Sequence, residues 1–199
     1  MNVYIWTSGE LKNAYIGEYH WYSFDFRNKT QSQAEANWWT IGGTYNSDAN
    51  GWYTSIWSYL DKSIDIVGHN KITITAEMNI YSAYSAGALC FGVWDGSNRM
   101  WEFTSGNTSS DRGIWFQIWS NRIGWDNHAT ISGATTLTYI IDFQNLSMSA
   151  KIVNWVNERT RTQSFSSAQA SAAQTSNATI YIYPDNVNHR LKILSYIIE

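Results

Sequence analysis

Alternation of apolar and polar residues with a period of two dominates this chain and predicts an all-β protein. The clearest case is residues 71–80, where every second residue is apolar: Ile72, Ile74, Ala76, Met78 and Ile80. Successive side chains of a strand point to opposite faces, so one face of this segment is expected in a core. Similar patterns predict strands at residues 21–26, 88–94, 137–143, 146–152, 178–183 and 190–198. Many short strands with turn signals between them indicate a sandwich or a barrel.

The remaining segments predict turns and little helix. Asp95-Gly96-Ser97-Asn98 and Gln144-Asn145 are typical of tight turns between strands. The best helix candidate is residues 166–174, which are rich in Ala, Ser and Gln and could equally form a polar loop, so residues 160–177 stay open. Residues 1–19 are interpreted as a short N-terminal hairpin or attachment segment, with strand-like pieces at 3–5 and 14–17. It precedes a main domain of residues 20–199.

The segment Ile114-Trp115-Phe116-Gln117-Ile118-Trp119 carries the first indication of function. Its alternation places Ile114, Phe116 and Ile118 on one face, and two indoles around an amide on the other. Indole rings stack on the apolar faces of sugars, and amides and hydroxyls satisfy sugar hydroxyl groups. With 12 Trp, 13 Tyr and 7 Phe among 199 residues, the sequence favours a binding module. The same indoles could instead pack in a core or a subunit interface.

Composition excludes several classes of partner. Charged residues form only 15% of the chain and its formal net charge is -3, which gives no electrostatic case for nucleic acid or an anionic membrane. A single cysteine, Cys90, excludes an internal disulfide. The first residues lack the pattern of a signal peptide, and no apolar run approaches the roughly 18 residues of a membrane span. We therefore expect synthesis in a cytosol and no membrane insertion.

Two segments resemble known families. The predicted hairpin of residues 137–149 and the closing strand of residues 191–198 resemble the concanavalin A-like lectin/glucanase superfamily, including laminin G-like modules. In that superfamily, a terminal strand returns to the first one, within a jelly-roll-like antiparallel β-sandwich. Residues 3–5 and 10–17 are similar to stretches near the start of bacteriophage tail and virion proteins. Together these resemblances imply a lectin-like virion protein.

Catalysis is not expected. The superfamily's retaining glucanases carry paired carboxylates on one strand, about 5 Å apart, whereas Glu77 and Glu102 each lack a partner at that spacing. The four histidines are scattered, and no zinc-ligand spacing, phosphate loop or nucleophile elbow is present. Calcium could bind the oxygens of Asp95 with Asn98, Asp126 with Asn127 or Asp185 with Asn186, but these are also ordinary turn residues. No cofactor is assigned.

A ligand is expected on the outward face near residues 94–128. The indoles come from five tryptophans and the hydrogen bonds from neighbouring polar side chains: Trp94, Asp95, Asn98, Trp101, Trp115, Gln117, Trp119, Trp125, Asp126 and Asn127. Elsewhere, adjacent Trp38 and Trp39 must point to opposite sides, so at most one of them can enter the core.

Three hypotheses follow. The first is a bacteriophage virion structural protein (fibre, tail or capsid decoration) with a lectin-like domain that binds host-surface glycans. The alternatives are a stand-alone carbohydrate-binding module or an assembly protein with no sugar ligand, whose aromatic face is a subunit interface. All three hypotheses favour a homo-oligomer. The expected partners are other virion proteins for the virion protein, and a glycan ligand wherever a lectin-like domain binds sugar.

Overall fold

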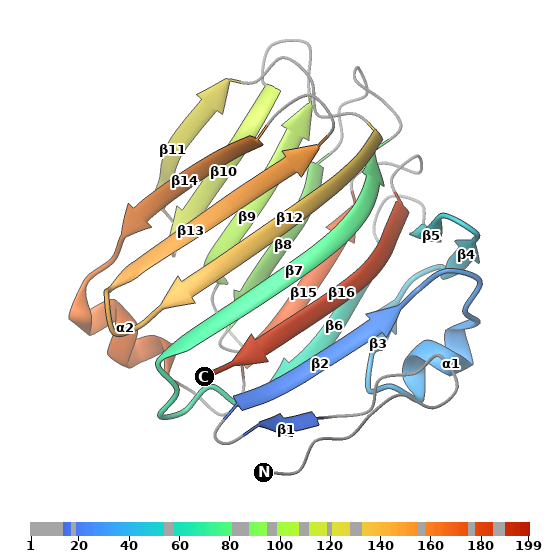
Figure 1. Cartoon of the computed structure of the whole chain (residues 1–199), viewed down its shortest axis with the longest axis horizontal. Coiled ribbons are helices and arrows are strands. Elements are labelled where there is room, and N and C mark those ends of the chain that lie inside the picture. Colours follow the sequence, from blue (N-terminus) through green and yellow to red (C-terminus); the bar gives the residue numbers. More distant parts are fainter. Residues whose placement is uncertain are drawn as a thin grey trace.

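Two antiparallel sheets packed face to face form the structure, which is a computed structural model (Figure 1). It describes residues 14–16, 19–53, 58–80, 88–94, 99–107, 112–118, 121–127, 133–154, 158–174, 178–184 and 190–199. The predicted turn at 95–98 and the strand-like piece at 3–5 lie outside these residues. The architecture confirms the predicted all-β, concanavalin A-like sandwich.

The strands divide between a nine-stranded and a seven-stranded sheet. In spatial order the first contains β1 (Ala14–Ile16), β2 (Tyr19–Asp25), β16 (Arg190–Ile198), β7 (Lys71–Ile80), β12 (Gly133–Asp142), β13 (Ser147–Asn154) and β14 (Glu158–Ser164), with the hairpin β4 (Asn46–Asp48) and β5 (Gly51–Tyr53) attached to β16. The second contains β11 (Asn121–Asn127), β10 (Arg112–Ile118), β9 (Arg99–Asn107), β8 (Ala88–Trp94), β15 (Ala178–Pro184), β6 (Tyr59–Ile64) and β3 (Thr40–Gly42).

The predicted pairings of the nine-stranded sheet are confirmed. Strands β12 and β13 form the expected hairpin, with Tyr139 opposite Ala150. The closing strand β16 returns to β2, with Leu194 opposite Phe24, and its other edge pairs with β7. Strand β1 pairs with β2, so this part of the predicted N-terminal segment joins the sheet.

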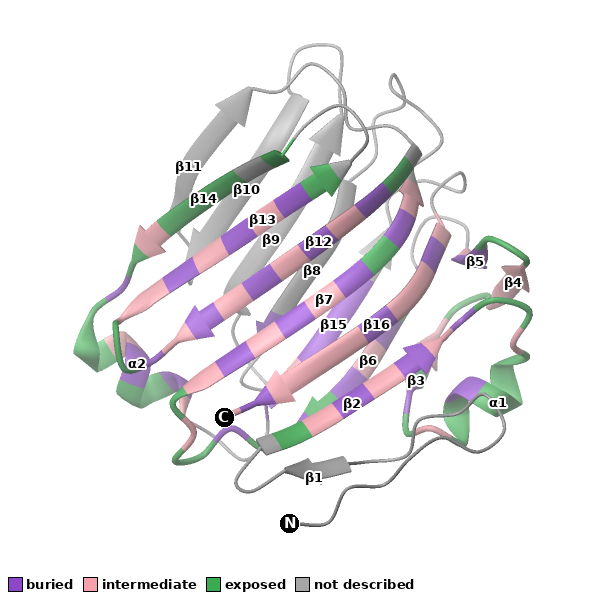
Figure 2. Cartoon of the chain, in the orientation of Figure 1, coloured by how far each residue is buried: buried purple, intermediate pink, exposed green. Residues whose placement is uncertain are grey.

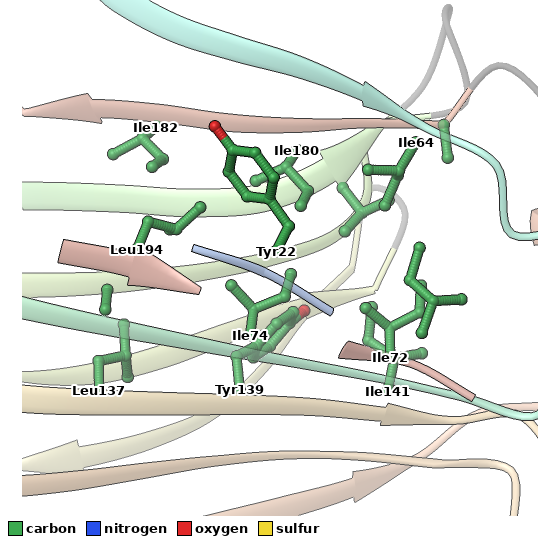
Figure 3. Close-up of a cluster of buried hydrophobic side chains, with 14 of the residues drawn as sticks. Tyr22, Ile64, Ile72, Ile74, Leu137, Tyr139, Ile141, Ile180, Ile182 and Leu194 are labelled. Atoms are coloured by element: carbon green, nitrogen blue, oxygen red, sulfur yellow. The ribbon is translucent and has the colours of Figure 1, made fainter. Parts of the chain in front are cut away.

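The core lies between the sheets and contains the predicted apolar stripes of β2, β7, β12 and β13. Every second residue of β7 and β12 is buried, which gives the alternating bands of Figure 2. Figure 3 shows side chains from both sheets gathered in one cluster. Its members include Ile72, Ile74, Leu137, Tyr139 and Ile141 from the nine-stranded sheet and Ile64, Ile180 and Ile182 from the seven-stranded sheet.

Both described helices are short and begin at capping boxes. Thr30 caps α1 (Gln31–Glu35) and Ser166 caps α2 (Ser167–Ala173), each exchanging hydrogen bonds with a glutamine three residues later. Residues 166–174, which the sequence left open, therefore contain a helix, and α1 was not predicted. No helix in the described part of the chain is long and apolar enough to cross a membrane.

The end of α1 separates the two adjacent tryptophans. Trp38 N donates to Glu35 O at 2.9 Å and Trp39 N donates to Ala34 O at 3.3 Å, the pair of bonds that closes a helix in a Schellman motif. Trp38 has φ 66 at the position where glycine is usual. Its side chain is 83% exposed, whereas Trp39 is 2% exposed. The expectation that only one of these indoles enters the core is confirmed.

A lysine occupies one core-facing position of β6. Lys62 is 4% exposed, and its Nζ donates to Asn37 O at 2.6 Å and lies 3.6 Å from the centre of the Tyr22 ring. Tyr22 OH also donates to Asn37 O, at 3.1 Å. Burial lowers the pKa of Lys62 to about 8, because removal from water disfavours the charged form. Lys62 therefore connects β6 to β2 and to the end of α1.

We predict that Lys62→Met raises the free energy of unfolding at pH 7 by about 1–3 kcal/mol, because an apolar side chain of similar volume removes the cost of the buried charge. Asn37 O keeps the Tyr22 hydroxyl as a donor. The wild type should also gain about 1 kcal/mol between pH 7 and 9, since the unfolded lysine keeps its proton up to about pH 10 while the folded one loses it near 8.

Urea unfolding at both pH values measures these effects. Lys151→Met is the matched control, because Lys151 is partly exposed and pairs with Glu158 on the surface; it should change stability by less than about 0.5 kcal/mol. A loss of stability in Lys62→Met, or a pH response that survives the substitution, contradicts the prediction.

Candidate functional site

The two faces of β6 have different surroundings. Leu60, Lys62 and Ile64 are buried towards the core, and Tyr59, Asp61 and Ser63 alternate with them. Because strand side chains alternate, the second set lies on the face of the seven-stranded sheet that points away from the core. We refer to this as the outer face. Its described part is formed by β3, β6 and β15.

Tyr59 supplies an aromatic surface on the outer face. A Cβ atom added at Gly42 on β3 would lie 2.1 Å from Tyr59 Cε1 and 2.2 Å from its Cζ, so the ring rests on the backbone of β3 where a side chain is missing. Gly42 and Tyr59 are also cross-strand partners. Tyr59 remains 41% exposed. A ring held in this way is a platform on which an apolar or sugar surface can stack.

Asp61 is the notable polar residue beside this platform. Its cross-strand partners are Thr40 on β3 and Tyr181 on β15. The side chain is half-buried and makes no hydrogen bond or ion pair within the part of the chain that the structure describes. Burial raises its pKa to about 6, since desolvation disfavours the charged carboxylate.

Tyr181 shows that the outer face is partly covered. It is 4% exposed, yet it alternates along β15 with the core residues Ile180 and Ile182 and is not a member of the core cluster. The outer face is therefore sheltered at β15 and open at Tyr59. Asp61 lies between these two positions.

Trp38 adds a strongly exposed indole at the edge of the same sheet. It lies two residues before Thr40, the β3 partner of Asp61. A left-handed backbone costs about 1–2 kcal/mol for a residue with a side chain, and an 83% exposed indole recovers none of this by packing in the core. Strain that stability does not explain is a reason to look for a function.

The strand register continues from Asp61 across the whole sheet. One cross-strand row runs through all seven strands: Thr40, Asp61, Tyr181, Gly92, Glu102, Gln117 and Arg122. With strands about 4.8 Å apart, the five steps from position 61 to position 122 span roughly 24 Å. Every residue of the row is polar or glycine, apart from the amphipathic Tyr181. The neighbouring rows are mostly apolar, with Lys62 and Asn121 as exceptions in one of them.

The predicted ligand residues fall on β8 to β11 or between these strands in the sequence. Trp115 is the partner of Trp125, and Gln117 lies in the polar row. Trp94 pairs with Thr179, and Asp126 and Asn127 pair with positions 114 and 113. Trp101 pairs with Val93, which is fully buried. The register therefore puts position 101 in a row with core-facing residues, whereas position 115 belongs to a row of the opposite face.

Asp95, Asn98 and Trp119 lie outside the described residues, as do the side chains of the other predicted ligand residues. Their role in binding therefore stays a prediction. Sequence reasoning did not identify Trp38, Tyr59 or Asp61 as candidate site residues. The alternation of residues 59–64 could have revealed the last two, but the lysine at position 62 interrupts the apolar stripe that would mark the core side.

Metal binding has no support in the described part of the chain, where no group of three or more His, Cys, Asp or Glu side chains could hold an ion. Of the calcium candidates, Asp95 with Asn98 and Asp185 with Asn186 lie outside these residues. Asp126 and Asn127 have a described backbone only.

Comparisons with known proteins give structural neighbours only. The CBM2 module of the evolved Dit protein from Lactobacillus casei BL23 phage J-1 superposes with a TM-score of 0.67 at 10% identity, covering 89% of this chain and 94% of that one. Lectin II from Ulex europaeus gives 0.66 at 8% identity, covering 88% and 97%. Arcelin-5, a lectin-like defence protein from Phaseolus vulgaris, gives 0.66 at 9% identity, covering 92% and 99%.

No protein-family model matches the sequence, and no curated protein matches it. The structural likeness confirms the concanavalin A-like fold over most of the chain. The resemblance of residues 3–17 to phage proteins is not tested by these neighbours.

We predict that Gly42→Ala displaces the Tyr59 ring, because the added methyl group would overlap it. The free energy of unfolding should fall by about 1–3 kcal/mol, and the NMR signals of the Tyr59 ring should shift. Gly68→Ala is the control: its φ is +76, but no atom lies within 4 Å of the added Cβ. It should cost about 1 kcal/mol from backbone strain and leave the Tyr59 signals in place. Unchanged Tyr59 signals in Gly42→Ala would show that the ring does not rest on β3.

Proposed function

We propose that this protein is a lectin-like component of a bacteriophage particle that binds glycans of the host surface. The observation that carries the proposal is the outer face of the seven-stranded sheet, where the exposed Tyr59 ring rests on β3 beside Asp61. The Asp61 carboxylate is half-buried and has no hydrogen-bond partner among the described residues. An aromatic surface next to a hydrogen-bond acceptor matches the two sides of a sugar ring, its C–H faces and its hydroxyl groups.

The extent of the polar row favours an elongated ligand site. It continues from Asp61 to Gln117, where the sequence places two more indoles. In this proposal Trp115, Trp119 and Trp125 contact further sugar units of the same oligosaccharide. The residues predicted from the sequence and those found in the structure then form two ends of one face.

The virion assignment draws on two supports. One is the structural neighbour from phage J-1, whose description names a carbohydrate-binding module; the other is the resemblance of residues 3–17 to phage tail and virion proteins. We propose a fibre, tail or capsid-decoration component that works without catalysis, in contact with other virion proteins.

A role in assembly alone is the second candidate. An exposed indole at the edge of a sheet, as found for Trp38, also suits a subunit interface, because interfaces are enriched in tryptophan and tyrosine. In that case the aromatic residues should become buried in a homo-oligomer, and no sugar should compete for them.

We predict saturable binding to a panel of host-surface glycans, followed by intrinsic tryptophan fluorescence. Tyr59→Ala, Trp115→Ala and Trp119→Ala should each weaken binding by about 1–3 kcal/mol, the scale of one stacked ring or buried aromatic contact. Val153→Ala is the control, because Val153 is an exposed residue of the other sheet. If no glycan binds, and the protein sediments as an oligomer that the aromatic substitutions dissociate, the outer face is an assembly surface.

Trp38→Gly should separate stability from binding. Glycine removes the left-handed strain at φ 66, so the free energy of unfolding should rise by about 1 kcal/mol. Glycan binding should weaken if the indole stacks on the ligand. Asn28→Gly changes another left-handed position, with φ 54, and should leave binding unchanged. A variant that is more stable and binds as tightly as the wild type would remove Trp38 from the site.

A further inference from the structure

The carboxylate of Asp61 carries an inference that rests on the glycan-binding function proposed above. We propose that Asp61 selects the ligand: it accepts hydroxyl hydrogen bonds from an uncharged sugar, and the protein releases that sugar in acid.

The surroundings of Asp61 contain no compensating charge. On the outer face its described neighbours are Tyr59 and Ser63 on its own strand, Thr40 and Gly42 on β3, and Thr179 and Tyr181 on β15. Among these positions the only titratable groups are the two tyrosines, and none is a lysine, arginine, histidine or second carboxyl. Burial of this carboxylate with no cation among these groups disfavours its ionised form.

The nearest cation in sequence cannot neutralise it. Lys62 follows Asp61 directly, but the two side chains lie on opposite faces of β6. The lysine amine is occupied by Asn37 O and the Tyr22 ring in the core. The half-buried carboxylate therefore depends on water for donors in the free protein. We propose that hydroxyl groups of a bound ligand replace that water.

The same features define the class of ligand. An ionised carboxylate accepts hydrogen bonds with both oxygens and donates none, so it suits neighbouring hydroxyl groups of a neutral sugar. Sialic acids and uronic acids would bring a second negative charge to a half-buried site without a cation, which is unfavourable. The face should therefore prefer neutral glycans to their acidic counterparts.

Release in acid follows from linkage. Burial raises the pKa of Asp61 to about 6 in the unliganded protein. Hydroxyl donors stabilise the ionised form and so lower the pKa towards the ordinary value near 4. The ligand then binds the ionised protein more tightly than the protonated one. By reciprocity its affinity is constant well above pH 6 and falls below it, about tenfold between pH 7.5 and pH 5.

The test uses immobilised neutral oligosaccharides of galactose, N-acetylgalactosamine, glucose and mannose, each beside a sialylated or uronic-acid counterpart, at pH 7.5 and pH 5. The wild type should bind neutral members best and about tenfold more weakly at pH 5. Asp61→Asn should bind at least tenfold more weakly at pH 7.5 and show no pH dependence. Asp65→Asn is the matched control, since Asp65 is exposed in the turn after β6, where it accepts a hydrogen bond from Val67 N; it should behave as the wild type.

A second measurement needs no variant. The NMR titration of the Asp61 carboxyl carbon should give a pKa near 6 without sugar and a lower value with the best-binding oligosaccharide. Glycan binding that is equal at both pH values, survives in Asp61→Asn with its pH dependence, or favours the sialylated or uronic-acid counterparts overturns this inference and leaves the glycan-binding function standing. Binding to no glycan at either pH overturns both.

Discussion

The alternation of β6 is the constraint on which the rest of this structure depends. Leu60 and Ile64 are buried between the sheets, which fixes the side of the strand that faces the core. A shift of one residue in its pairing would expose both and bury Tyr59 and Asp61. The hydrophobic effect that holds the two sheets together therefore also determines which residues the outer face presents. Core and candidate site are two consequences of the same register.

The alternation of β6 places two neighbouring charged residues in different environments. Asp61 and Lys62 are adjacent and of opposite sign, yet the strand directs them to different faces. Both are desolvated, which raises the pKa of the carboxyl and lowers that of the amine. Lys62 has the Asn37 carbonyl and the face of the Tyr22 ring, whereas Asp61 has no such partner in the described part of the chain. The fold gives a hydrogen-bond partner to the charge that it buries in the core, whereas the half-buried carboxylate on the outer face has none among the described residues.

Most of the fold could be predicted from the sequence, and the site could be predicted only in part. Strands such as β7 and β12 have one face in the core, so burial selects a strict alternation that is visible in the residues themselves. The helix α1 was missed because five residues show no apolar periodicity, and its Thr30–Gln33 capping box is a short signal. Asp61 was missed for a different reason. Its significance depends on what surrounds it across β3 and β15, and cross-strand neighbours are set by register rather than by sequence separation.

Trp38 and Gly42 show how information from the sequence and information from the structure combine. Adjacency alone predicts that Trp38 and Trp39 diverge, and only the backbone shows that the outward one occupies a left-handed position. The missing side chain of Gly42 likewise gains meaning only from the Tyr59 ring that rests on it. In both cases an arrangement that does little for the core displays an aromatic ring at the edge of the seven-stranded sheet. Trp38 lies two residues before β3, the Tyr59 ring rests on β3, and the Asp61 carboxylate lies on the next strand. None of the three side chains belongs to the core cluster, and the proposed ligand recognition accounts for all three features.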